Sequence, residues 1–120
     1  MKKLVETNKQ ESVLADWRGA RAKLWMFHVT HNRMAISLSR KGEHEALYII
    51  CVACERLSGP FHWDQADIRI ITEAPNQWGE VRRRIVDTQA GFELLCSDVV
   101  IIHGAASVPT DPFDNFLDEK

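Results

Sequence analysis

Short runs of β-branched and aromatic residues recur about every ten residues along the chain, separated by turn-forming residues. Such side chains fit a pleated, half-buried surface, so each run predicts a strand. Regular short strands with frequent turns favour a sandwich or a small barrel. We therefore expect a mainly β fold of about six or seven mostly antiparallel strands, with a short N-terminal helical segment.

Two hydrophobic patterns define the expected strands. Apolar and polar residues alternate over residues 34–39, which predicts a strand with one buried face. Residues 47–53 are apolar without interruption, which predicts a central strand covered on both faces. Further strands are expected at residues 24–30, 68–72, 92–96 and 99–103, and the two-residue connection Ser97-Asp98 allows a hairpin between the last two.

Residues 78–87 support two interpretations. As a strand, this segment pairs with residues 92–96 across a turn that contains Gly91. As a helix, it places apolar residues at spacings of three and seven and a Glu–Arg pair at a spacing of four. We favour the strand, and the alternative is an α+β fold with a helix at residues 76–90.

The ends of the chain differ in composition from its middle. Residues 1–11 are polar, and we expect a flexible N-terminus there. Ser12 is a suitable N-cap for a short helix that opens a single β-rich domain over residues 12–104. Residues 105–120 form an acidic, phenylalanine-containing C-terminal tail.

Cys51 and Cys54 form a Cys-x-x-Cys motif followed by His62. A shared metal ion or a disulfide needs the two sulfur atoms close together. The apolar residues around the pair predict a continuous strand, in which residues three apart point to opposite faces. We therefore expect buried, reduced thiols that face away from each other, with no metal and no cofactor.

The overall composition argues against several classes of function. The net charge of -2 gives no attraction to nucleic acid or to anionic membranes, and no apolar run reaches the roughly 18 residues of a membrane helix. No phosphate-binding glycine loop and no G-x-S-x-G nucleophile elbow is present. We expect a cytoplasmic protein without nucleic-acid or membrane partners, and the sequence offers no positive sign of an enzyme.

Two groups of residues are candidates for contact with a protein partner. Trp63 and Trp78 lie in or beside expected loops, where a tryptophan either caps a β core or anchors a contact. In the tail, Phe113, Phe116 and Leu117 follow a spacing of three and four among acidic residues. This spacing is typical of an amphipathic turn that docks in a groove of its own domain, a sister subunit or another protein.

Three hypotheses for the function follow. We favour a non-catalytic protein-interaction or self-associating module that uses the two tryptophans and the tail. The alternative is a small-ligand or metal-binding domain that uses Cys54, His62, Trp63 and Cys96. The third is an enzyme of unknown reaction.

Overall fold

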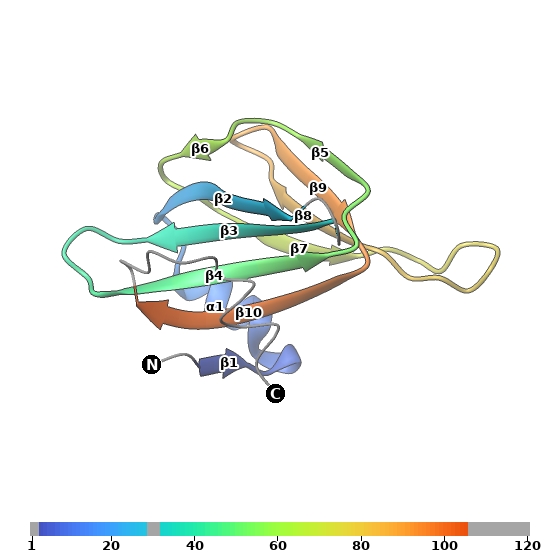
Figure 1. Ribbon diagram of the computed structural model, residues 1–120, viewed down its shortest axis with the longest axis horizontal. Coiled ribbons are helices and arrows are strands. Elements are labelled where there is room, and N and C mark those ends of the chain that lie inside the picture. Colours follow the sequence, from blue (N-terminus) through green and yellow to red (C-terminus); the bar gives the residue numbers. More distant parts are fainter. Residues whose placement is uncertain (1–2, 29–31, 106–120) are drawn as a thin grey trace.

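The computed structural model describes residues 3–28 and 32–105. They form two antiparallel β-sheets of six and four strands and a short helical segment near the N-terminus (Figure 1). The sheets do not close into a barrel. The predicted mainly β fold is confirmed, and the alternative helix at residues 76–90 is wrong because this segment contributes a strand and a loop.

The strands of each sheet come from separate parts of the chain. In order, the large sheet contains β1 (Lys3–Val5), β10 (Asp98–Ala105), β4 (Glu45–Val52), β3 (Arg33–Ser39), β2 (Arg21–His28) and β6 (His62–Trp63). The small sheet contains β5 (Arg56–Ser58), β9 (Phe92–Cys96), β8 (Arg83–Asp87) and β7 (Arg69–Thr72).

Residues 3–11 contribute to the described secondary structure, in a region (residues 1–11) where the sequence predicted a flexible N-terminus. Strand β1 pairs with β10, the 3-10 helix η1 spans Thr7–Lys9, and helix α1 spans Gln10–Asp16. Gln10 is buried, and its side-chain amide donates a hydrogen bond to the carbonyl of Val99 at 3.1 Å. This bond joins two residues that are far apart in the sequence, so no local pattern indicates it. The sequence therefore placed the start of the helix at Ser12, whereas α1 begins at Gln10.

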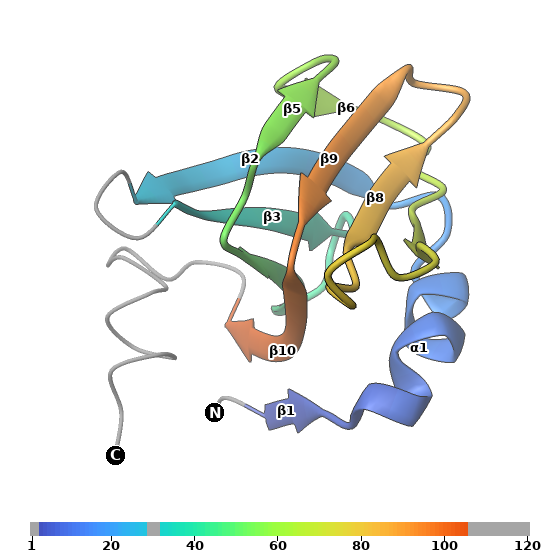
Figure 2. The ribbon, with the colours of Figure 1, turned by 90° about the vertical axis from the view of Figure 1, so that its right-hand side faces the viewer.

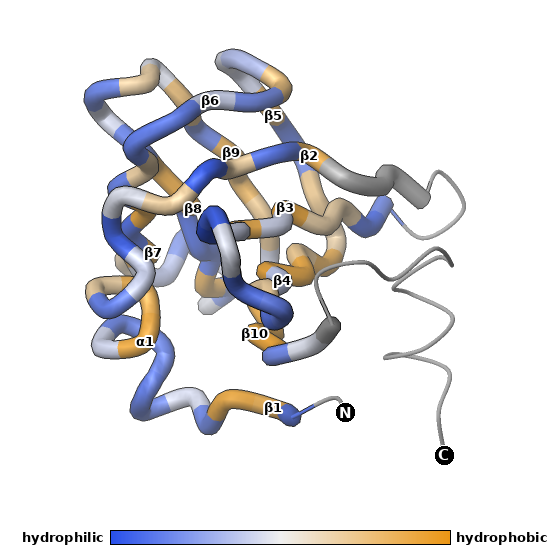
Figure 3. The backbone as a smooth tube through the Cα atoms, turned by 90° about the vertical axis from the view of Figure 1, so that its left-hand side faces the viewer, coloured by the Kyte–Doolittle hydropathy of each residue, from blue (hydrophilic) through white to orange (hydrophobic). Residues whose placement is uncertain are grey.

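Helix α1 protects one edge of the small sheet. It contacts the edge strand β7, and Figure 3 places the two elements next to each other. Leu14 of α1 is buried in the core that lies between the sheets. The helix therefore covers a strand edge that could otherwise pair with another chain.

Strand β4 is covered on both faces, as its apolar sequence predicted. Leu47, Ile49 and Cys51 belong to the main core, which also contains residues of the small sheet and α1. Tyr48 and Ile50 point to the opposite face and form a second buried cluster. The strand therefore separates two apolar regions, and only the first lies between the two sheets.

The last strands follow one prediction and depart from another. Strands β8 and β9 form the predicted hairpin around Gly91. The suggested hairpin between residues 92–96 and 99–103 is wrong, because β9 belongs to the small sheet and β10 to the large one. The amide of Ser97 donates to the carbonyl of Val52 at 3.0 Å, where the chain crosses between the sheets.

A buried carboxylate joins the two sheets at the other end of β8. Asp87 is 1% exposed, and it accepts hydrogen bonds from the indole of Trp63 at 2.7 Å and from the amide of Asp67 at 2.8 Å. The Trp63 ring also packs on Phe92, with a centroid distance of 4.7 Å. Because Trp63 lies on β6 and Asp87 on β8, this contact connects one sheet with the other.

Replacing this carboxylate is expected to destabilise the fold. Asp87→Ala leaves three partly buried donors, the Trp63 indole and the amides of Asp67 and Ala90, without their acceptor and should lower the free energy of unfolding by about 3 kcal/mol. Trp63→Phe removes one of these donors and should lower the free energy of unfolding by about 1–2 kcal/mol. Urea denaturation measures both values. The control Asp64→Ala removes an exposed ion pair and should change stability by less than about 0.5 kcal/mol, and an equal loss in the control would contradict this assignment.

Candidate functional site

The structure does not bring together the ligand-site residues Cys54, His62 and Trp63. Cys54 follows the end of β4, and its amide donates to the carbonyl of Asn32 at 2.8 Å. Strand β6, which contains His62 and Trp63, pairs with β2 at Ala22. Asn32 and Ala22 lie at opposite ends of the β2–β3 hairpin, which corresponds to about 20 Å of strand.

The three cysteines instead gather at the junction between the sheets. Cys51 and Cys96 are fully buried in the main core, and Cys54 packs against the same core. The prediction that Cys51 and Cys54 point to opposite faces is wrong. The strand ends at Val52, and Ala53 has a positive φ of 56°, which interrupts the alternation of side chains.

The surroundings of the thiols disfavour reactivity. Burial, with a smaller contribution from Cys96, raises the pKa of Cys54 to about 12. A hydrogen bond between Cys51 and Cys96 raises the pKa of the first thiol and lowers that of the second. Cys96, the thiol with the lowered pKa, is fully buried like Cys51. In the part of the chain that the structure describes, no group of three or more His, Cys, Asp and Glu residues is arranged to hold a metal ion.

The candidate contact residues fall into different environments. Trp63 is partly buried and donates its indole proton to Asp87, so its ring supports the fold. Trp78 is 75% exposed. Phe113, Phe116 and Leu117 lie outside the described residues.

Trp78 lies on a loop that projects from the molecule. Residues 73–82 connect β7 with β8, and we call them the Trp78 loop. In Figure 1 this loop extends well beyond the sheets as the yellow segment on the right. Of the five large hydrophobic residues that are exposed in the described chain, three belong to this loop or to β7: Ile71, Trp78 and Val81.

The tip of the Trp78 loop is held by one asparagine. The side-chain oxygen of Asn76 accepts hydrogen bonds from the amides of Trp78 and Glu80, each at 2.9 Å. The Asn76 amide donates to the Glu80 carbonyl at 3.0 Å, and the Gly79 amide donates to the Asn76 carbonyl at 3.0 Å. A side chain that bonds to the following backbone in this way stabilises a turn. The loop therefore presents Trp78 in a defined conformation.

Ion pairs fix the base of the same loop. Arg82 pairs with Glu55, and Arg84 pairs with Glu73 at 3.4 Å. The Glu73 amide also donates to the carbonyl of Arg82 at 2.9 Å, which continues the β7–β8 ladder into the loop. The arginine run of residues 82–84 is thus paired with carboxylates, so it adds little basic surface.

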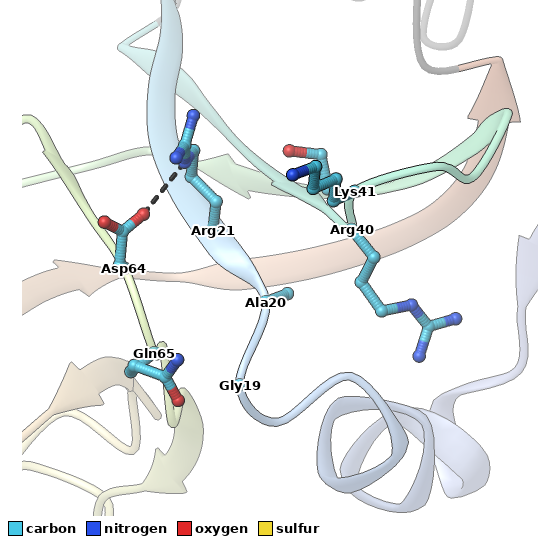
Figure 4. A pocket seen from close by; sticks show the side chains of 8 residues that line it. Gly19, Ala20, Arg21, Arg40, Lys41, Asp64 and Gln65 are labelled. Carbon is cyan, nitrogen blue, oxygen red and sulfur yellow. Dashed lines mark hydrogen bonds and ion pairs between the residues drawn. The ribbon is translucent and has the colours of Figure 1, made fainter.

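A cleft of about 640 Å³ lies at the opposite end of the large sheet, beside the β3–β4 turn (Figure 4). Arg21 pairs with Asp64 at 2.8 Å, and Arg40 pairs with Glu43 at 2.9 Å. Figure 4 shows Arg40 directed toward α1, where its guanidinium lies 3.8 Å from the centre of the Trp17 ring. The cleft is lined by Gly19, Ala20, Arg21, Ser39, Arg40, Lys41, Asp64 and Gln65.

Sequence reasoning missed this cleft because its walls come from three separate connections. Lys41 belongs to the β3–β4 turn, Arg21 to the start of β2, and Gln65 to the segment after β6. Each looks like an ordinary surface residue in its local sequence. Within residues 3–28 and 32–105, Lys41 is the cation of the cleft for which no ion pair forms.

Comparisons with protein-family models, with curated proteins and with solved structures found no match for this chain. In the described residues, no helix is long and apolar enough to cross a membrane. The functional argument therefore depends on the geometry of the molecule itself.

The thiols should react slowly with a disulfide reagent in the native state. With a pKa of about 12, Cys54 holds about a thousandth of the thiolate of an ordinary cysteine at neutral pH. Its reaction with Ellman's reagent should be about a thousandfold slower than that of free cysteine and should accelerate as pH rises. Cys51 and Cys96 should react only after unfolding. Rapid reaction of one or more thiols in the folded protein at pH 7 would contradict this description.

Proposed function

We propose that the protein is a non-catalytic protein-interaction module and that the Trp78 loop is its contact surface. The observation that carries this proposal is an indole that is 75% exposed at the tip of an internally hydrogen-bonded loop. Tryptophan is enriched among the residues that dominate binding energy at protein interfaces. At 75% exposure, the Trp78 side chain gains little from burial within its own domain.

The order of the loop supports the same proposal. Binding by a disordered loop loses conformational freedom, whereas a loop with a fixed tip has lost much of that freedom already. Two further apolar side chains, Ile71 of β7 and Val81 of the loop, are also exposed, at 43% and 40%. The charged residues at the base are paired with each other, so the partner contact is expected to centre on the tryptophan.

Trp78→Ala should weaken binding of the partner by at least about 30-fold while leaving the fold unchanged. The experiment compares proteins retained by immobilised wild type and variants, and then measures the affinity of each retained partner. Sedimentation of the isolated chain tests self-association at the same surface. Phe61→Ala is the matched control, because Phe61 is 70% exposed and lies on another loop.

A second variant separates the indole from the shape of the loop. Asn76→Ala keeps Trp78 but removes the two hydrogen bonds that hold the turn. This variant should lower the affinity for the same partner by about tenfold, because the loop must then become ordered on binding. If Trp78→Ala retains every partner and the self-association of the wild type, the proposal is wrong.

A second candidate function is binding of a small anionic ligand in the cleft. The observation that favours it is Lys41, which lines the same hollow of about 640 Å³ as Arg21. Titration with inorganic pyrophosphate should shift the backbone amide resonances of Gly19 and Lys41. Lys41→Glu should abolish these shifts, whereas Lys3→Glu, on a distant exposed strand, should preserve them. If pyrophosphate leaves the amide resonances of the wild-type protein unchanged, the cleft does not bind this anion.

A further inference from the structure

Two cysteines from different sheets meet where the chain passes from β9 into β10. Cys51 lies near the end of β4 in the large sheet, and Cys96 is the last residue of β9 in the small sheet. Both are 0% exposed and belong to the main core. A hydrogen bond joins their side chains. The two sulfur atoms are therefore neighbours, although more than 40 residues separate them along the chain.

Backbone hydrogen bonds on either side hold the pair in this position. The amide of Ser97 donates to the carbonyl of Val52 at 3.0 Å, and the amide of Glu55 donates to the carbonyl of Leu95 at 2.8 Å. Figure 2 shows β9 leading directly into β10, with β5 beside it. The approach of the two cysteine-bearing segments is therefore fixed by the backbone and does not depend on one side-chain rotamer.

The pair lies directly beneath the surface at this junction. Ala53 and Ser97, which are neighbours of the two cysteines in the sequence, are exposed. Cys54 is partly buried, and its thiol donates to the carbonyl of Cys51 at 3.4 Å. A small oxidant can reach the pair through a local opening of these exposed segments. Ellman's reagent, a bulky aromatic disulfide, needs a much larger opening.

The two thiols have different roles in an oxidation. Their hydrogen bond lowers the pKa of Cys96 and raises that of Cys51, as expected when the Cys51 thiol donates to the Cys96 sulfur. The thiolate is the reactive form of cysteine. Cys96 is therefore the attacking sulfur, and Cys51 stands within reach of the product.

We propose that Cys51 and Cys96 form a disulfide between the two sheets when the protein meets a small hydroperoxide such as hydrogen peroxide. The Cys96 thiolate attacks one peroxide oxygen, the O–O bond breaks, and Cys96 becomes a sulfenic acid. The other oxygen leaves as hydroxide and takes up the proton that Cys96 lost, which gives water. The Cys51 sulfur then attacks the Cys96 sulfur, the S–O bond breaks, and the departing hydroxide takes the Cys51 proton to form a second water. Each sulfur loses one electron, and each peroxide oxygen gains one.

The disulfide reinforces the end of the small sheet that Asp87 does not hold. In the β8–β9 hairpin, Asp87 pairs with Phe92 at one end, and Arg83 pairs with Cys96 at the other. At the second end the chain itself passes into β10, and the disulfide adds a direct link from β9 to β4. This oxidation is independent of the contact surface and of the cleft proposed above.

Mass spectrometry of the full chain tests which thiols are joined. Reduced protein is treated with hydrogen peroxide for hours at neutral pH, the remaining thiols are alkylated in urea, and tryptic peptides are analysed without reduction. We expect one disulfide within the chain and one alkylated cysteine. Cys51 and Cys54 share a tryptic peptide, so fragmentation must locate the alkyl group on Cys54. Oxidation of the unfolded chain in urea should instead join mainly Cys51 with Cys54, because the shorter loop closes more readily.

Matched variants and thermal unfolding complete the test. Cys54→Ala should still form the disulfide, whereas Cys51→Ala should not form it. The disulfide closes a loop of about 45 residues, so it should raise the Tm of the wild type by at least about 5 °C, and dithiothreitol should reverse the rise. The proposal is overturned if the folded wild type joins Cys96 mainly to Cys54, forms a disulfide only between chains, or forms none.

Discussion

The buried carboxylate of Asp87 is the contact on which the arrangement of the two sheets depends. It accepts bonds from β6, from the segment before β7 and from the β8–β9 turn, where the Ala90 amide donates at 3.3 Å. Since the cysteines are not joined in disulfides, no covalent link replaces this connection. Its directional bonds fix the relative position of the two sheets, which apolar packing alone specifies less strictly.

This arrangement also determines which residues remain available for binding. The indole of Trp63 is hydrogen-bonded to Asp87, whereas the side chain of Trp78 is exposed. The bond to the Asp67 amide holds the segment that lines the cleft with Asp64 and Gln65. The Trp78 loop begins and ends on β7 and β8, whose ladder is anchored at the same carboxylate. The loop proposed as a contact surface is therefore connected, through β7 and β8, to the same contact between the sheets.

The cysteines show that a sequence motif can mislead in two ways: it can suggest a metal or Cys-x-x-Cys redox site that is absent from the described residues, and the strand pattern around it can suggest thiols that diverge. Cys51 and Cys54 resemble a metal or redox pair, and the period of a strand argues that they diverge. The structure differs from both interpretations, because one residue with positive φ, Ala53, redirects the chain toward the core. Alanine gives no sequence signal for that conformation, which is usually adopted by glycine or asparagine. The convergence of Cys96 depends on a strand that is more than 40 residues away.

The sequence by itself determined the β class of the fold, the two-sided burial of β4 and the β8–β9 hairpin, because these follow from local periodicity and turn residues. It also singled out Trp78, although it did not distinguish that residue from Trp63. Only the tertiary structure decided which tryptophan bonds to Asp87, that Gln10 anchors α1, and that β9 and β10 belong to different sheets. Each of these features joins residues distant in sequence, and hydrophobic periodicity records which side of an element is buried but not which partner covers it.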